Sequence, residues 1–130
     1  MSARLKVLIA DDEIVIADTL GMILRQDGYE CQVAYSGRSA LQQTLDFQPA
    51  LLISDVIMPD MNGVEVAIRI RELLPACEVL LLSGQASAVD LMQRAREAGH
   101  DFDILNKPIH PDELLRWVET RIKRGGNGSA

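Results

Sequence analysis

Five short apolar runs alternate along the chain with segments in which apolar residues recur every three or four positions. The runs cover residues 6–10, 31–35, 51–54, 79–82 and 102–105. Several of them are continuous rather than alternating, which is typical of parallel strands that are buried on both faces. The pattern therefore predicts five buried strands separated by helices.

The segments between the runs have the spacing of amphipathic helices. Ile16, Leu20, Ile23 and Leu24 fall on one helical face, and Gly28 stands where a helix C-cap is expected. Further helices are predicted by Leu41 and Leu45, by Val64 and Ile68, across residues 88–98, and by the stripe Leu114, Leu115, Val118 and Ile122. Repeated strand and helix predict an α/β domain with a parallel sheet and right-handed crossovers.

The chain of 130 residues has the length of one domain. We expect the domain to cover residues 1–124, and residues 125–130, which have nothing to bury, to be a flexible tail or the start of a linker. Apolar residues make up 48% of the chain and charged residues 25%, as in ordinary soluble proteins. No apolar run approaches the roughly 18 residues of a membrane span, and the N-terminal run is too short for a signal peptide. We therefore expect a cytoplasmic protein without a membrane partner.

The formal net charge of −6 argues against direct nucleic-acid binding, which normally requires a basic surface. Cys31 and Cys77 are too few and too unpatterned for a disulfide framework or a zinc site. We expect both to be small apolar residues near the core.

Candidate chemistry lies in the residues that follow the apolar runs. Asp11 and Asp12 follow the first run, Asp55 the third and Ser83 the fourth, and Lys107 comes just after the fifth. The carboxyl ends of the strands form one edge of a doubly wound sheet, and ligands bind at that edge. Each residue alone has a simpler explanation, such as a helix N-cap for Asp12 or a solvated loop residue for Lys107. Their joint placement is what predicts a site.

Grouped carboxylates repel one another, by about 1 kcal/mol at 4 Å in water and about 4 kcal/mol at an effective dielectric of 20. Three together raise a pKa unless a cation lies between them. An oxygen-rich pocket without histidine or thiol suits Mg²⁺, and Lys107 adds a second positive group. A carboxylate beside both cations is prepared for phosphoryl transfer, so Asp55 is expected to form an aspartyl phosphate whose oxygen Ser83 can bind.

Four segments form a wider pattern, namely IADDE, LLISDVIMPDMNGVE, LLLSG and NKP. In this order and spacing, over about residues 4–122, the chain resembles a two-component response-regulator receiver domain. Any one segment alone would be weak, whereas the combination is highly specific. The resemblance implies a flavodoxin-like, doubly wound sheet of five parallel strands in the order 2-1-3-4-5, with helices on both faces.

The resemblance assigns a role to each acid at the predicted edge. Asp55 would be the phosphoacceptor and a metal ligand. Asp12 would bind Mg²⁺ directly, Asp11 directly or through water, and the backbone carbonyl of Ile57 would supply another ligand. The chain would then catalyse only its own Mg²⁺-dependent phosphorylation and dephosphorylation and would not otherwise be an enzyme.

The resemblance also implies partners. Ser83 and Lys107 would bind the phosphoryl group, and the Lys107–Pro108 bond is often cis in the family. The donor would be a sensor histidine kinase or a histidine phosphotransfer protein, with small acyl phosphates as substitutes. Phosphorylation would change a face formed by the fourth helix, fifth strand and fifth helix, which binds a downstream protein target. We expect a monomer or a weak dimer.

Three positions depart from the family or vary within it. Ile104 occupies the switch position where the family usually has Tyr or Phe, and the nearest aromatic residue is Phe102. Ile57 and Gln85 stand where the family tunes the lifetime of the phosphorylated form. No output domain follows, so the chain is either a stand-alone receiver or a fragment of a longer regulator.

Three other functions remain open at this stage. A degenerate receiver would act as a docking module without phosphorylation, but the full set of acidic, hydroxyl and lysine residues argues against it. A haloacid-dehalogenase-like phosphatase would need a second acid two residues after its nucleophile, where Ile57 stands. A flavin-binding protein would need a hydroxyl-rich phosphate loop after the first strand, where Asp11 and Asp12 stand.

Overall fold

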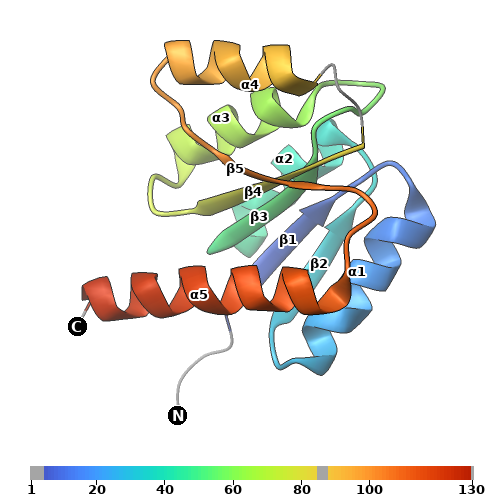
Figure 1. The fold of residues 1–130 in the computed structure, drawn as a ribbon, viewed down its shortest axis with the longest axis vertical. Coiled ribbons are helices and arrows are strands. Elements are labelled where there is room, and N and C mark those ends of the chain that lie inside the picture. The colour runs from blue at the N-terminus through green and yellow to red at the C-terminus, as the bar shows by residue number, and fades with distance from the viewer. Residues whose placement is uncertain (1–4, 85–87, 130) are drawn as a thin grey trace.

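The computed structural model describes residues 5–84 and 88–129, which form a single sheet with helices on both faces (Figure 1). The elements in chain order are β1 (Lys6–Ala10), α1 (Ile14–Gln26), β2 (Glu30–Ala34), α2 (Gly37–Phe47), β3 (Leu51–Asp55), α3 (Gly63–Leu73), β4 (Glu78–Ser83), α4 (Ala88–Glu97), β5 (Asp103–Asn106) and α5 (Pro111–Ser129). The predicted alternation of strand and helix is therefore confirmed.

The five strands are all parallel and lie in the order β2-β1-β3-β4-β5. This is the doubly wound order that the family resemblance implied. Ala10 pairs with Ser54, Asp55 pairs with Leu82, and Ser83 pairs with Asn106. The carboxyl ends of β1, β3, β4 and β5 therefore lie along one edge, which brings the residues that follow them together.

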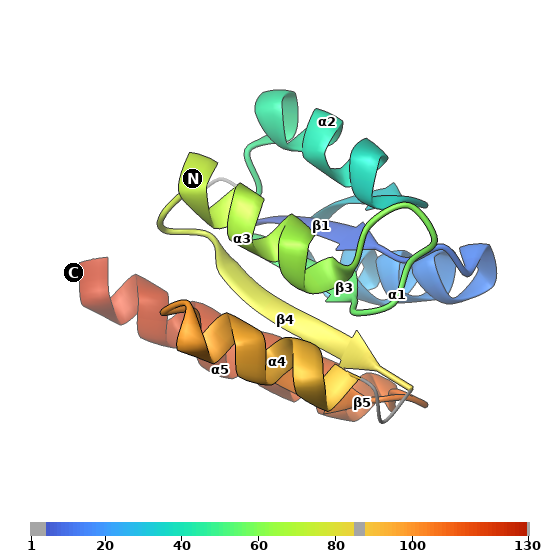
Figure 2. The same cartoon turned by 90° about the horizontal axis from the view of Figure 1, so that it is seen from above.

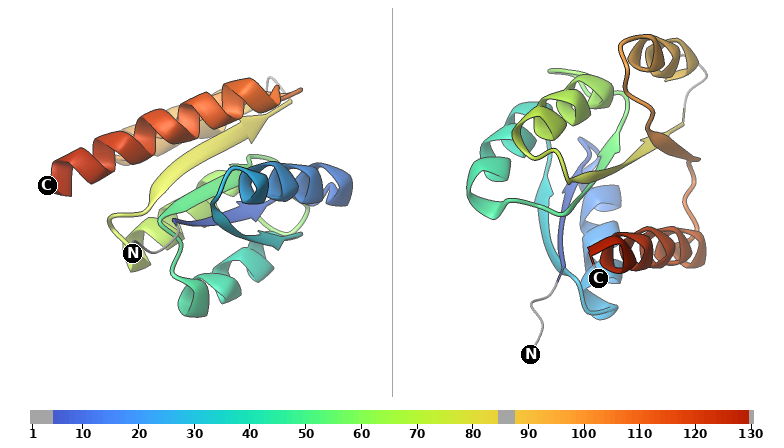
Figure 3. Two further views of the ribbon diagram at one scale, coloured as in Figure 1. Left: turned by 90° about the horizontal axis from the view of Figure 1, so that it is seen from below. Right: turned by 90° about the vertical axis from the view of Figure 1, so that its left-hand side faces the viewer.

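Two apolar layers hold the helices against the sheet. On one face, β1, β3 and β4 pack against α2, α3 and α4 through residues that include Leu8, Leu52, Leu81, Ala40, Val66 and Met92. On the other face, the alternate strand residues pack against α1 and α5 through residues that include Ile9, Ile53, Leu80, Leu24 and Leu114. Figure 2 and Figure 3 show these two helical layers. Because neighbouring residues of the inner strands point to opposite apolar layers, the strands appear in the sequence as continuous apolar runs.

The helix ends follow local sequence signals. The C-cap of α1 is Asp27, one residue before the predicted Gly28. Gly28 follows with a φ of 99°, and its N–H donates to the carbonyl of Arg25, which closes the helix. The hydroxyl of Ser36 caps α2 by accepting from the N–H of Ser39, and the amide oxygen of Asn62 caps α3 by accepting from the N–H of Glu65.

The structure differs from the expected elements at a few positions. β2 ends at Ala34, so Tyr35 lies beyond the strand and is exposed. Phe102 precedes β5 and is buried, since its ring packs in the layer with α3 and α4. α5 continues to Ser129, through residues that we expected to form a tail, and the domain boundary at residue 124 stays a prediction. No helix within the described ranges is both long enough and apolar enough to cross a membrane.

Candidate functional site

Three carboxylates meet at the carboxyl edge of the sheet. Asp11 and Asp12 directly follow β1, and Asp55 is the last residue of β3. One oxygen of each lies within 4.8 Å of the others. Asp11 is fully buried and Asp55 is only 6% exposed, whereas Asp12 is exposed at the rim. The cluster therefore has two acids in the protein interior and one that faces solvent.

Lys107 places a single ammonium among the acids. Its Nζ donates to Asp11 Oδ2 at 2.9 Å, to Asp55 Oδ2 at 3.1 Å and to Glu13 Oε1 at 3.2 Å. The side chain is 14% exposed, so these are largely buried ion pairs. The peptide bond between Lys107 and Pro108 is cis. Sequence reasoning missed Glu13, although it is the third acid of the Asp11-Asp12-Glu13 run that follows β1.

The other oxygen of each buried acid is held by the backbone. Asp55 Oδ1 accepts from the N–H of Ile57 at 3.3 Å, and Asp11 Oδ1 accepts from the N–H of Glu13 at 3.0 Å. Gly63 is needed beside this arrangement, because a Cβ there would lie 2.0 Å from the backbone oxygen of Asp55. The start of α3 therefore packs directly on the end of β3, and both acids have fixed orientations.

The surroundings of the site raise the pKa values of both Asp55 and Lys107. A raised pKa favours the neutral form of the aspartate but the charged form of the lysine. Burial raises the pKa of Asp55, Asp11 raises it further, and the contacts with Lys107 and Ile57 only partly offset this. Burial acts to lower the pKa of Lys107, but the hydrogen bonds and charges of Asp11 and Asp55 outweigh it and raise that pKa. The raised pKa keeps the lysine charged, and its one ammonium is shared among Asp11, Glu13 and Asp55.

A cavity of about 350 Å³ opens above the cluster. Its lining residues are Asp12, Glu13, Asp55, Ile57, Gly84 and Lys107. Ser83 ends β4 beside the cavity, is buried, and accepts the backbone N–H of Lys107 through its own carbonyl at 2.8 Å. Gln85, the other expected lifetime position, lies outside the described residues. The structure thus brings Ser83 and Lys107 to the same strand ends as the three acids.

The donor set fits Mg²⁺. The clustered ligand atoms are carboxylate oxygens, with no histidine or thiol among them. Mg²⁺ prefers such oxygen ligands, commonly one or two carboxylates together with waters and phosphate oxygens. The cavity leaves room for water and a phosphoryl group beside Asp55 and Asp12.

The switch position lies away from the cavity. Ile104 is in β5 and is 37% exposed. The ring of Phe102 stacks on His100 with centroids 5.8 Å apart and lies under the guanidinium of Arg71 at 5.1 Å. Trp117 of α5 is half-buried, and its Nε1–H donates to Asp103 at 3.0 Å. The nearest aromatic ring to Ile104 in the sequence is therefore already held in the core.

Comparison with known families identifies the class of protein. A family model of the response regulator receiver domain matches residues 7–119. The chain belongs to this family, and it is a receiver domain of two-component signalling.

Several longer proteins are similar to this chain over about half of their length. The DNA-binding response regulator MtrA of Mycobacterium tuberculosis is 30% identical over 127 residues, which are 98% of this chain and 54% of that protein. The probable transcriptional regulatory protein TcrX of Mycobacterium tuberculosis is 31% identical over 120 residues, which are 92% of this chain and 50% of that protein. The chain thus spans about half the length of the curated relatives that it matches.

Solved structures agree over nearly their whole length. A CheY-like response regulator receiver domain protein from Methanospirillum hungatei superimposes with a TM-score of 0.88 at 26% identity, covering 97% of this chain and 99% of that one. The chemotaxis protein CheY4 of Vibrio cholerae gives a TM-score of 0.81 at 32% identity, covering 91% and 98%. The fold and the family expected from the sequence are both confirmed, and the degenerate receiver is not favoured.

Proposed function

We propose that Asp55 accepts a phosphoryl group from a phosphohistidine of a signalling partner and that the resulting aspartyl phosphate switches the binding of a downstream protein. The observation that supports this most is the buried carboxylate pair, Asp11 and Asp55, which shares one ammonium at the floor of an open cavity. Such excess negative charge in the interior is costly unless a cation joins it. Within the domain, the chemistry is limited to phosphorylation and dephosphorylation of this one side chain.

The chain's own groups account for the transfer. A carboxylate oxygen of Asp55 attacks phosphorus while the bond from phosphorus to the donor nitrogen breaks, and the electron pair leaves with the imidazole. The ammonium of Lys107, which donates a hydrogen bond to Asp55 in this structure, can donate to a phosphoryl oxygen once the group is transferred. The hydroxyl of Ser83 can donate to another phosphoryl oxygen. Mg²⁺ bound by Asp11, Asp12, Asp55 and the carbonyl of Ile57 would neutralise charge on the transferred group.

An apolar groove beside the site supports a protein donor. It has a volume of about 240 Å³, and α1 and the segment after Lys107 line it through residues that include Val15, Ile16, Leu20, Pro108 and Ile109. Val15 is 78% exposed, and Lys107 borders both this groove and the acidic cavity. A donor seated on the groove would bring its phosphohistidine to Asp55, so we propose a sensor histidine kinase or a histidine phosphotransfer protein as the partner.

The output face would be α4, β5 and α5. The exposed side chains of Val89 on α4 and Ile104 on β5 give this face apolar character. Ile104 occupies the switch position, and Phe102, the nearest aromatic residue in the sequence, is held in the core, so we expect a modest change at this face. Relatives such as MtrA are named as DNA-binding proteins, but they are about twice as long. For this chain, whose net charge is −6, we propose a protein target in the cytoplasm and no direct contact with DNA.

The proposal is tested by incubating the protein with acetyl phosphate and Mg²⁺ and measuring intact mass. The protein should gain one phosphoryl group, and Asp55→Asn, which preserves volume but removes the nucleophilic carboxylate, should gain none. Phosphorylation of Asp55→Asn at normal yield would refute the assignment.

Two further measurements on the same samples test the switch and the lifetime. Trp117 fluorescence should respond to phosphorylation or to a beryllofluoride mimic but scarcely to Mg²⁺ alone. The indole is on α5 at the proposed output face, where it donates a hydrogen bond to Asp103, and it does not line the acidic cavity. Ile57→Asn should change the decay rate of the phosphorylated form, since Ile57 lines the cavity and its apolar side chain cannot orient an attacking water.

A further inference from the structure

Asp60 links two parts of the fold that are distant in sequence. It lies in the loop between β3 and α3, which covers residues 56–62. Its Oδ1 accepts from the N–H of Gly37 at 3.0 Å, and its Oδ2 accepts from the N–H of Arg38 at 2.9 Å. These two hydrogen bonds lower the pKa of Asp60, and the bond from Arg38 has the larger effect. Both carboxylate oxygens are thus used on the first turn of α2.

The same helix already has a local cap. Ser36 accepts from the N–H of Ser39 at 3.1 Å, so α2 begins with an ordinary N-cap from its own segment. Asp60 adds a second cap from a loop that is more than twenty residues away in the chain. The bonds of Ser36 stabilise only the helix, whereas those of Asp60 also restrain the loop.

The loop is anchored at both ends as well. The N–H of Gly63, which directly follows the loop, donates to the carbonyl of Val56, the first loop residue, at 2.7 Å, so this bond joins the two ends. Close to the second end, Met61 packs on Gly37 so closely that a Cβ on that glycine would lie 2.3 Å from the Met61 Cγ. The two bonds of Asp60 therefore fix the centre of a loop whose ends are held by β3 and α3.

Ile57 is the residue through which this loop reaches the site. Its N–H donates to Asp55 Oδ1 at 3.3 Å, and Ile57 is one of the residues that line the acidic cavity. A loop released from α2 would leave the backbone of Ile57 free to rotate away from Asp55. Both the orientation of the Asp55 carboxylate and the position of the Ile57 carbonyl depend on this backbone.

We infer that Asp60 is a positioning residue for the acidic site: by tying the β3–α3 loop to α2, it holds the backbone of Ile57 in place for the phosphoacceptor and for Mg²⁺. The part of this inference that concerns Mg²⁺ rests on the proposed function, whereas the restraint of the loop does not. Groups that orient metal ligands from outside the ligand shell typically contribute 10–100-fold in metal affinity.

Asp60→Ala and Ser36→Ala form a matched pair, because each removes one cap of α2 and only the first frees the loop. Each variant should raise the unfolding equilibrium constant by about fivefold, the usual effect of losing a cap. In metal-free protein, amide hydrogen exchange across residues 57–61 should become about tenfold faster in Asp60→Ala and stay unchanged in Ser36→Ala. In a Mg²⁺ titration, Asp60→Ala should bind about tenfold more weakly, and Ser36→Ala should match the parent. Asp60→Asn, which retains one acceptor oxygen, should fall between Asp60→Ala and the parent.

Equal loop exchange in the two alanine variants would overturn the inference, whatever happens to Mg²⁺. Faster exchange in Asp60→Ala with unchanged Mg²⁺ affinity would also overturn it, because the loop would then be restrained without serving the site. If the parent itself bound no Mg²⁺ and gained no phosphoryl group, the proposed function would fail. In that case, the exchange experiment alone would decide whether Asp60 holds the loop.

Discussion

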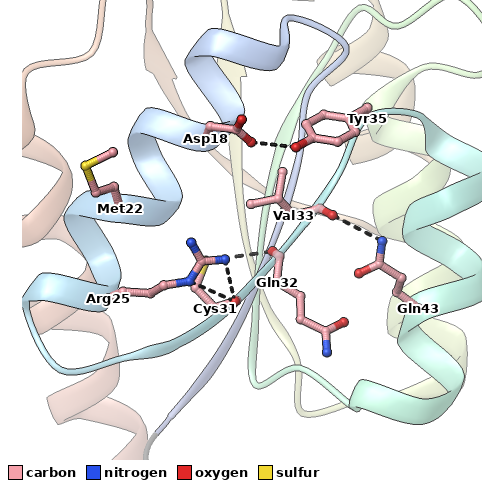
Figure 4. Close-up of a pocket in the computed structure, with 8 residues that line it drawn as sticks. All are labelled: Asp18, Met22, Arg25, Cys31, Gln32, Val33, Tyr35 and Gln43. Carbon is pink, nitrogen blue, oxygen red and sulfur yellow. Dashed lines mark hydrogen bonds between the residues drawn. The ribbon is translucent and has the colours of Figure 1, made fainter.

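Two of the hollows on this domain, the groove along β2 and the acidic cavity, use their polar groups differently. The groove along the edge strand β2 has a volume of about 580 Å³, and the acidic cavity at the strand ends has about 350 Å³. Residues of α1, β2 and α2 line the groove (Figure 4). The smaller of these two hollows contains the carboxylate cluster, so volume does not distinguish a functional site here. The two hollows differ in the partners that their polar groups have.

In the β2 groove, protein groups bond to one another. Arg25 donates through Nε and a terminal nitrogen to the carbonyl of Cys31 at 3.2 and 2.9 Å, and Gln43 donates to the carbonyl of Val33 at 3.2 Å (Figure 4). The hydroxyl of Tyr35 donates to Asp18 at 2.6 Å. The two carbonyls lie on the outer side of an edge strand, where an open backbone invites pairing with another strand. Arg25 and Gln43 therefore cover that edge.

In the acidic cavity, the carboxylates outnumber the positively charged groups that bind them. Lys107 is shared by Asp11, Glu13 and Asp55, and within the described ranges the carboxylate of Asp12 has no hydrogen bond or ion pair. One positive charge thus faces four acids. A site of this kind is therefore recognised by charge that the protein leaves uncompensated, because such charge attracts a cation and then a phosphoryl group.

The largest difference between the two hollows should appear when each loses its cation. Lys107→Met should lower the free energy of unfolding by about 3 kcal/mol at pH 7 without Mg²⁺, because it leaves buried carboxylates without a counter-charge. Arg25→Met should cost about 1 kcal/mol, because water can replace its bond to an edge carbonyl. Urea unfolding of both variants measures the two losses, and equal losses would contradict the comparison.

The pH range of the Lys107 contribution follows from its raised pKa. A group whose pKa is higher in the folded state contributes fully below its unfolded value, here the ordinary lysine value of 10.5. The contribution is lost only as the pH rises through the folded value. At pH 7 to 9, the difference between Lys107→Met and the parent should therefore keep its full size.

Removing one exposed acid from each hollow should have the next largest effect. Asp12→Asn should weaken Mg²⁺ binding at least about tenfold, or about 1.4 kcal/mol, and slow phosphorylation, because a charged oxygen of the cluster is lost. Asp18→Asn makes the same chemical change beside Tyr35 and should leave Mg²⁺ affinity unchanged. A Mg²⁺ titration that gave equal affinities for the two variants would show that Asp12 is not a ligand.

Replacing the buried acid Asp55 should stabilise the metal-free protein. Burial raises the pKa of Asp55 above its ordinary value of 3.8, so its effect on folding is favourable at low pH and is lost as the pH rises through the folded pKa. At pH 7, Asp55→Asn should raise Tm by ~3 °C, and the gain should shrink as the pH falls toward 3.8. Asp18→Asn controls for the change in net charge, and a loss of stability in Asp55→Asn at pH 7 would refute this account.

How far the sequence could predict these features depends on how local each one is. The sheet and the three acids were predictable, because continuous apolar runs identify buried strands and each acid directly follows a run. Glu13 was missed because its reach to Lys107 depends on how the chain turns after β1. Arg25 and Gln43 look like solvated helix residues in the sequence, since the carbonyls that they bind belong to a different element.

The smallest effect should come from filling space beside the β2 groove. A Cβ on Gly21 would lie 3.1 Å from a methyl carbon of Val33 and 3.6 Å from a guanidinium nitrogen of Arg25. Gly21→Ala should gain about 0.5–1 kcal/mol of helix propensity in α1 and lose a similar amount as Val33 gives way, so stability should stay within about 0.5 kcal/mol of the parent. Mg²⁺ affinity and phosphate incorporation should not change, because none of the residues that line the groove also lines the acidic cavity. A shift in Mg²⁺ affinity caused by this methyl group would mean that the two hollows are coupled through β1 and that their separation is wrong.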